Sequence, residues 1–182
     1  AKEIRATVAE DVASFTVEQG RPPGLAVVII GRDAPSTVYL EQILRGCAKV
    51  GIDARFAELE GEATETAVVE RIRELNADPA VDGVIVQMPL PRSIRLRTVI
   101  DAIDPAKDID GIHPLNAGLL RLGYDGFLPA TAHAAVEILR KDLAILLETA
   151  RTERFPAVVA RAAHTLYEDA ARLGYGQEDD AA

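Results

Sequence analysis

Three connecting segments of the sequence carry a side chain that the packing of helices and strands does not require. Gln87 comes directly after the apolar run at 84–86, Tyr39 follows an apolar run that ends at Gly31, and Asp110 lies within the stretch 108–114. Binding and catalytic residues concentrate in the connections between regular elements. An amide, an aromatic ring and a carboxylate in such positions are therefore the first candidates for a functional site.

The elements that would position these side chains are strands alternating with helices. The stretch 81–87 reads Val-Asp-Gly-Val-Ile-Val-Gln, and its lack of polar alternation predicts a parallel strand buried on both faces. Ligands of open α/β sheets collect beyond the carboxyl ends of such strands, so Gln87 is expected at the mouth of a crevice. Pro89 and Pro91 would stiffen the exit from the sheet. The alternative is that Gln87 only caps the end of the strand.

The rest of the chain repeats this alternation. Helices are predicted at 4–19, 37–50, 64–75 and 96–103, and further strands at 25–30 and 54–59. Ser36 is expected to be the N-cap of the helix at 37–50. From residue 131 onward the sequence predicts two Ala-rich helices, at 131–147 and 155–173, and no strand. The fold class is therefore α/β, a three-layer α/β/α arrangement with a mostly parallel sheet, followed by C-terminal helices.

Composition restricts the class of protein further. Of the 182 residues, 48% are hydrophobic but only 4% are aromatic, which is typical of an aliphatic parallel sheet covered by helices. The net charge of −9 argues against nucleic acid or an anionic membrane surface as a partner. A single cysteine, Cys47, excludes an internal disulfide and fits a reducing compartment. Because no signal stretch or membrane-spanning run is present, a cytoplasmic protein is expected.

Three strings of the sequence resemble the bifunctional methylenetetrahydrofolate dehydrogenase/methenyltetrahydrofolate cyclohydrolase family, the FolD-type enzymes. They read PGLAVVIIGRDAPSTVYL at 23–40, ELNADPAVDGVIVQMPLP at 74–91 and AIDPAKDIDGIHPLNAGLL at 102–120. The resemblance covers residues 4–139, and the two strings VQ-x-PLP and KD-x-DG-x-HP-x-N-x-G are specific when they occur together.

The resemblance implies a site for tetrahydrofolate. Tyr39 would stack on the folate, Gln87 would lie at the one-carbon centre, and Asp110 would hydrogen-bond the edge of the pterin. These residue types suit the ligand, because a flat heteroaromatic ring stacks on an aromatic face and its amino and amide edge pairs with a carboxylate. The remaining residues expected to line the folate site are Ser36, Ile43, Pro89, Leu90, Gly111, Pro129 and Thr131.

The sequence departs from the family pattern at points that concern catalysis. The family carries a lysine one helical turn after the tyrosine, and this sequence has Ile43 there. Isoleucine cannot supply charge or protons for opening the methenyl bridge, and Arg45 would point to another side of the helix. The family's Cys-Thr-Pro is replaced by Pro-Ala-Thr-Ala-His at 129–133, and no Gly-x-Gly-x-x-Gly turn occurs. The sequence therefore predicts no NAD(P) site and no dehydrogenase activity, with C-terminal helices in place of the Rossmann domain.

The sequence contains three histidines, and two of them have both a structural and a catalytic interpretation. His113 either shapes its loop or acts as a base, and His133 either lies on the surface or replaces the missing acid/base. His164 is expected to face solvent, and Cys47 to be a small core residue. Because these residues lack the clustered spacing of metal ligands, no metal is expected. Asp104, Asp108 and Asp110 likewise do not match a calcium-binding loop.

Two classes of function remain open after these exclusions. In the first, the chain is a folate-dependent one-carbon transferase that passes the methylene group of 5,10-methylenetetrahydrofolate to an amine or carbon nucleophile, with Gln87, Asp110 and His133 as catalytic candidates. A residual cyclohydrolase is a variant of this class. In the second, the chain binds folate without catalysis or serves as a partner of another enzyme.

The predicted organisation has three parts. Residues 1–143 would form the folate-binding α/β domain, and 144–176 a helical segment that packs on this domain or on a partner. An acidic tail at 177–182 is expected to be disordered. The expected partners are a reduced folate, a nucleophilic small molecule and, through the C-terminal helices, a second copy of the chain.

Overall fold

The computed structural model describes the backbone of residues 2–31, 34–124 and 126–172, and their side chains except those at 2, 3, 34–39, 168 and 170–172. The chain divides into two compact units, Ala1–Ile109 and Asp110–Ala182. The first unit contains the sheet. The second is built from helices in the part that the structure describes.

The sheet of the first unit has three parallel strands, as the sequence predicts. They are β1 (Gly24–Ile30), β2 (Asp53–Leu59) and β3 (Gly83–Val86), in the order β2-β1-β3. Every residue of β1 is buried, because a strand pairs with it on either side and helices cover both faces. The central strand is therefore β1, and β3 lies at one edge, extended by a bridge between Val84 and Asp108.

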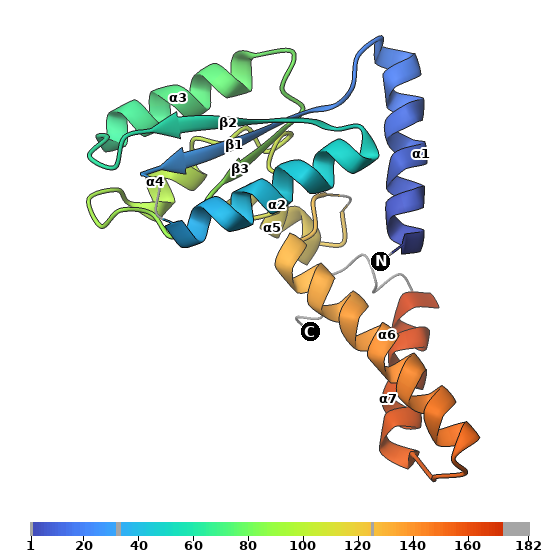
Figure 1. Cartoon of the computed structure of the whole chain (residues 1–182). Coiled ribbons are helices and arrows are strands. Elements are labelled where there is room, and N and C mark those ends of the chain that lie inside the picture. The colour runs from blue at the N-terminus through green and yellow to red at the C-terminus, as the bar shows by residue number, and fades with distance from the viewer. Residues whose placement is uncertain (1, 32–33, 125, 173–182) are drawn as a thin grey trace. The chain divides into compact units, whose positions relative to one another are not determined.

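Helices α2 (Ala34–Val50) and α3 (Glu65–Ala77) lie on opposite sides of this sheet (Figure 1). Alternate residues of β1 point to the two sides, which explains why one strand can serve both helices. Leu25, Val27 and Ile29 form a core cluster with Leu40 of α2. On the other side, Val68 and Ile72 of α3 are fully buried. The predicted three-layer α/β/α arrangement is confirmed.

The helix boundaries follow local signals in some places and not in others. Thr64 caps α3 as expected, and its hydroxyl accepts a hydrogen bond from the Ala67 backbone N–H at 3.2 Å. The prediction that Ser36 caps α2 is wrong, because α2 begins two residues earlier, at Ala34. Pro35 is tolerated inside that helix since its first turn needs no backbone N–H donors. The unit also contains α1 (Lys2–Gln19) and the short α4 (Leu96–Ile100).

The amino edge of the sheet is held by an ion pair. The Arg21 guanidinium donates to both carboxylate oxygens of Asp82, at 2.6 and 2.9 Å, and the Gly24 backbone N–H donates to Asp82 Oδ2 at 2.7 Å. The hydrogen bond from Arg21 is the main cause of a lowered pKa of Asp82. This carboxylate therefore joins the start of β1 to the start of β3, at the edge opposite Gln87.

The second unit contains α5 (Pro114–Arg121), α6 (Ala130–Thr152) and α7 (Val158–Arg172). The last two correspond to the helices predicted at 131–147 and 155–173, while α5 is not among the predicted helices. The predicted boundary between residues 143 and 144 falls inside α6, which runs without a break because no glycine or proline interrupts it. The extent of the folate-binding part stays a prediction. Among the helices of the described ranges, none is both long and apolar enough to cross a membrane.

Candidate functional site

Gln87 lies at the carboxyl edge of the sheet, where the sequence predicts it. Its backbone N–H donates to the Val28 carbonyl at 2.9 Å, so the pairing with β1 continues one residue past the end of β3. At the same edge the Gly31 N–H donates to the Leu59 carbonyl at 2.9 Å, where β1 and β2 end. β1 and β2 therefore end together, at Ile30 and Leu59, while β3 ends opposite Val28, two residues earlier along β1.

The side chain of Gln87 is held close to its own backbone. Its amide Nε2 donates to the Met88 carbonyl at 2.7 Å, and the residue is half-buried. This bond uses one of the two amide hydrogens, so Gln87 can still donate the other and accept through Oε1. The next peptide bond, Met88–Pro89, is cis, and of the two expected lining residues Pro89 is exposed and Leu90 half-buried.

The backbone of α2 brings Tyr39 to the same edge. Because α2 follows β1, its first turns begin at the carboxyl end of the sheet, and Tyr39 lies in the second turn. The side chains of Ser36 and Tyr39 are outside the described residues, so the predicted stacking on Tyr39 remains a prediction.

Ile43 stands one turn further along α2 and faces the core. Its half-buried side chain packs against the cluster of Leu25, Val27, Ile29 and Leu40, as does that of Cys47, whose thiol pKa is raised by burial. The expectation that Cys47 is a small core residue is confirmed. Arg45 points away from this cluster and pairs with Glu41 at 2.7 Å on the exposed surface.

The loop that follows Gln87 is held to α3 by an ion pair between Arg95 and Glu65, which the sequence pattern does not predict. The backbone N–H of Arg95 donates to Glu65 Oε2 at 2.8 Å, and its guanidinium donates to Oε1 at 2.6 Å. The hydrogen bond from the guanidinium lowers the pKa of Glu65 from its ordinary value of 4.5 to about 2. Glu65 opens α3, so its charge also suits the helix dipole. The only sequence signal was an acidic residue in the first turn of a predicted helix.

The segment that leads to Asp110 is anchored beside β3. The Lys107 carbonyl accepts a hydrogen bond from the Val84 N–H at 2.8 Å. The Lys107 ammonium donates to the carbonyls of Leu75, Asn76 and Asp78 at the carboxyl end of α3, at 2.7 to 3.3 Å. A cation in this position satisfies carbonyls that have no partner in the helix. Asp108, the next residue, is fully buried. Lys107 therefore has a structural function.

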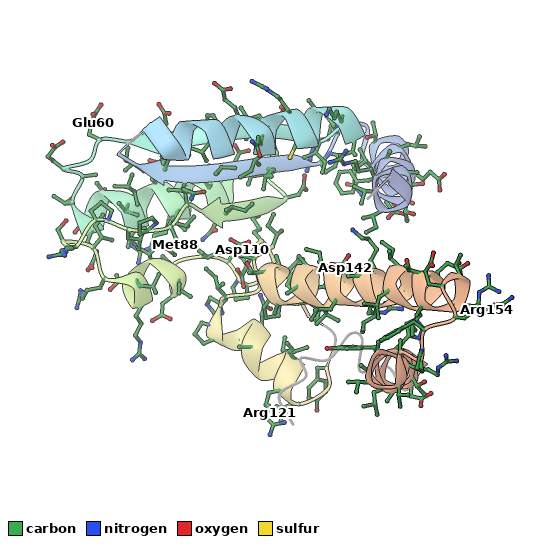
Figure 2. All side chains as sticks on the ribbon, turned by 60° about the horizontal axis from the view of Figure 1, so that its bottom comes forward. Glu60, Met88, Asp110, Arg121, Asp142 and Arg154 are labelled. Carbon is green, nitrogen blue, oxygen red and sulfur yellow. The ribbon has the colours of Figure 1, made fainter. Side chains whose placement is uncertain are left out.

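In the second unit, Asp110 and Gly111 lie against the start of α6. The Ala130 N–H donates to the Asp110 carbonyl at 3.2 Å, and Figure 2 shows Asp110 beside the first turn of α6. Gly111 has a φ of +64°, and a Cβ built on it would come within 2.7 Å of the Leu128 carbonyl. Only glycine fits this close approach of two backbones. The structure thus brings Asp110 and Gly111 together with Pro129, the N-cap of α6.

The histidines differ in how they are held. His113 caps α5, where its Nδ1 accepts a hydrogen bond from the Leu115 N–H at 3.0 Å, so its proton in the neutral form lies on Nε2. This geometry supports the loop-shaping interpretation. His133 is exposed in the first turn of α6, as is Thr131. His164 is half-buried on α7, which differs from the expected solvent-facing position because this side of α7 packs on α6.

The described side chains include no group of three or more His, Cys, Asp or Glu residues that could hold a metal ion. The expected site residues fall in both units, with Gln87, Ile43, Pro89 and Leu90 in the first and Asp110, Gly111, Pro129, Thr131 and His133 in the second.

Comparisons with known proteins agree with the resemblance found in the sequence. The family model described as tetrahydrofolate dehydrogenase/cyclohydrolase, catalytic domain, matches residues 1–110. The Bifunctional protein FolD of Rhodopirellula baltica is 44% identical over 147 residues, which are 78% of this chain and 49% of the relative. The same protein of Sorangium cellulosum is 45% identical over 140 residues, with 76% and 49% covered. The chain spans about half the length of these curated relatives.

Two solved structures extend the likeness to the fold. The 5,10-methylenetetrahydrofolate dehydrogenase of the silkworm Bombyx mori has a TM-score of 0.73 at 37% identity, covering 77% of this chain and 48% of that one. The dehydrogenase-cyclohydrolase of Trypanosoma brucei, complexed with NADP cofactor and inhibitor, has a TM-score of 0.72 at 31% identity, covering 78% and 48%.

Proposed function

Because the chain belongs to the tetrahydrofolate dehydrogenase/cyclohydrolase family, we propose that it binds a reduced folate at the carboxyl edge of its sheet. One observation carries the proposal. Gln87 directly follows β3 at that edge, and its side chain has an amide hydrogen and a carbonyl oxygen that remain available while its backbone is hydrogen-bonded to β1. An amide with both capacities suits the polar nitrogens around a one-carbon bridge.

The second unit would contribute the carboxylate of Asp110. In the proposal this carboxylate accepts hydrogen bonds from the amino and ring N–H groups of the pterin. The tight contact between Gly111 and Leu128 supports this function, since it limits the positions that the loop can take. Tyr39 would supply the aromatic face for stacking.

We infer that the reaction is transfer of a methylene group from 5,10-methylenetetrahydrofolate. One C–N bond of the bridging aminal breaks and its electron pair returns to nitrogen, which takes up a proton. The resulting iminium carbon is attacked by an amine or carbon nucleophile that loses a proton. The second C–N bond then breaks as the nucleophilic atom gives up a second proton and forms a double bond to the methylene carbon. The electron pair of the broken bond goes to the folate nitrogen, which takes up a proton, and tetrahydrofolate is released. No electrons leave the folate, so the reaction needs no hydride acceptor.

The side chain of Ile43 favours this reaction over hydrolysis. It is apolar and packs on the core, so it offers no ammonium group to assist water. An apolar surface that excludes water slows hydrolysis of the iminium ion, so that a stronger nucleophile can react with it first. His133, exposed in the first turn of α6, is the proposed group for moving the protons.

A second candidate function is folate binding without catalysis. The packing of Ile43 on the core supports this candidate as well, because isoleucine replaces the lysine of the family pattern and supplies no proton donor of its own. Residual cyclohydrolase activity is a third variant. Incubation of the chain with 5,10-methylenetetrahydrofolate and a panel of primary amines, followed by mass spectrometry, separates transfer from binding without catalysis. A methylene-linked adduct that forms faster than in a reaction without protein supports transfer. Tight binding with no adduct supports the binder.

A further inference from the structure

Helix α7 presents apolar residues on the side that faces away from α6. Its half-buried residues recur at helical spacing and include Ala160, Ala163 and Tyr167, which identifies the side that packs on α6. The opposite side carries Val158, Val159, Ala162 and Leu166, all exposed, and Val159 is 84% exposed. We call these four residues the α7 ridge.

Helix α6 and the turn that follows it form an apolar groove. The groove has a volume of about 630 Å³, and its apolar walls are Ile145, Leu146, Ala150 and Phe155. Phe155 is 68% exposed and Ile145 56%. Two carboxylates, those of Asp142 and Glu153, also border it. We call this hollow the α6 groove.

We propose that the α6 groove binds the α7 ridge of a second copy of this chain. The groove is hollow, and the ridge offers the exposed branched side chains of Val158, Val159 and Leu166 to fill it. In a two-fold dimer each copy would supply one groove and one ridge, so the contact would be made twice. The product would be a four-helix arrangement of two hairpins. The proposal does not depend on folate binding.

The area of these surfaces is sufficient for a stable pair. The six large apolar residues of groove and ridge together expose on the order of 800 Å² per copy, which matches the roughly 800 Å² that each partner buries in an interface of standard size. Exposed apolar surface of this extent is uncommon on a monomer and marks an interaction site.

Charge at the two surfaces favours a second copy as the occupant. The groove is bordered by the exposed carboxylate of Glu153, while the ridge is flanked on α7 by the exposed guanidinium of Arg161. Seating the ridge of one copy in the groove of the other can therefore place opposite charges at the rim. Such pairs add specificity more than affinity.

The test is the mass of the whole chain in solution, measured by light scattering after size exclusion and by sedimentation. At about 100 μM the mass of the native chain is expected to approach twice 19.5 kDa, because most of the chain is dimeric at this concentration when the Kd is about 10 μM or tighter. Val159→Asp and Ile145→Asp are each expected to shift the mass to 19.5 kDa, because a carboxylate would be buried in an apolar contact.

The matched control is Val17→Asp on α1. Val17 is 86% exposed, nearly the same as Val159, but it lies in the other unit. This variant is expected to remain a dimer. Far-ultraviolet circular dichroism checks that all variants keep their helices, which exposed substitutions should not disturb.

A charge exchange tests the orientation of the pair. Glu153→Arg and Arg161→Glu are each expected to weaken the dimer, and the double variant to recover part of the loss. A native chain that stays at 19.5 kDa at every concentration overturns the proposal. So does a dimer that Val17→Asp dissociates but Val159→Asp does not. A monomer in which Val159→Asp lowers the free energy of unfolding would show that the ridge is covered by the same chain, which also overturns it.

Discussion

The backbone carbonyl of Asp110 accepts a hydrogen bond from the backbone N–H of Ala130 at 3.2 Å. This bond ties the loop that carries the proposed pterin-binding carboxylate to the first residue of α6. The next residue, Gly111, adds a second close contact between the same two segments, because its backbone lies against the carbonyls of Phe127 and Leu128. The position of the Asp110 carboxylate thus depends on a long-range backbone contact.

Gly111→Ala is expected to break that contact. The new Cβ would lie 2.7 Å from the Leu128 carbonyl carbon and oxygen, and the φ of +64° is itself unfavourable for alanine. We expect the free energy of unfolding to fall by about 1–3 kcal/mol. Urea denaturation followed by circular dichroism measures the change.

Gly118→Ala is the control for this substitution. A Cβ on Gly118 meets no atom within 4 Å, and the residue lies inside α5. Alanine is the better helix former, so the variant is expected to gain about 0.5–1 kcal/mol of stability. Equal losses in the two glycine variants would contradict the close contact at Gly111.

Asp110→Ala is expected to weaken binding of tetrahydrofolate. Loss of a carboxylate that accepts hydrogen bonds from the pterin should cost about 1–3 kcal/mol of binding free energy. Isothermal titration calorimetry gives the change in Kd, with Asp11→Ala, an exposed position on α1, as the control. Unchanged affinity in the Asp110 variant would remove this residue from the proposed site.

Ile43→Lys is expected to introduce methenyltetrahydrofolate hydrolysis. The lysine stem can cover the core cluster while its ammonium reaches toward the edge of the sheet, at a loss of roughly 1–2 kcal/mol in stability from poorer burial. The decay of methenyltetrahydrofolate absorbance reports the activity. Leu44→Lys, one position further around the helix, should remain inactive, and activity in both or neither would count against the assignment of Ile43.

The Glu65–Arg95 pair is expected to make stability depend on pH in the acid range. Because folding lowers the pKa of Glu65 from 4.5 to about 2, the stabilisation is fully present above pH 4.5 and is lost as the pH falls through about 2. Glu65→Gln should therefore lose stability relative to the native chain at neutral pH, and the difference should shrink on acidification. Urea titrations at several pH values test this. A difference that grows toward low pH would refute it.

Local signals in the sequence predicted most elements of the first unit. The continuous apolar run at 25–30 identified the buried central strand, and Thr64 identified the start of α3 because an N-cap acts on its own helix. Two of the misjudged features have local causes as well. Ser36 is a common N-cap residue but lies inside α2, and α5 escaped prediction because it is short and is capped by a histidine.

The parts of the candidate site that sequence could not predict depend on contacts distant along the chain. The closeness of Gly111 to Leu128 and the link from Arg95 to Glu65 join segments whose spacing carries no periodic signal. Lys107 likewise belongs to a motif that suggested ligand binding, yet it caps α3. Residue type and spacing indicated where polar groups gather, and tertiary packing determined which of them support the backbone.

Calorimetric titration of the native chain with tetrahydrofolate tests the central claim most directly. The account predicts saturable binding at one site per chain, weakened by substitution of either Gln87 or Asp110 by alanine. No detectable binding to the folded native chain would contradict it.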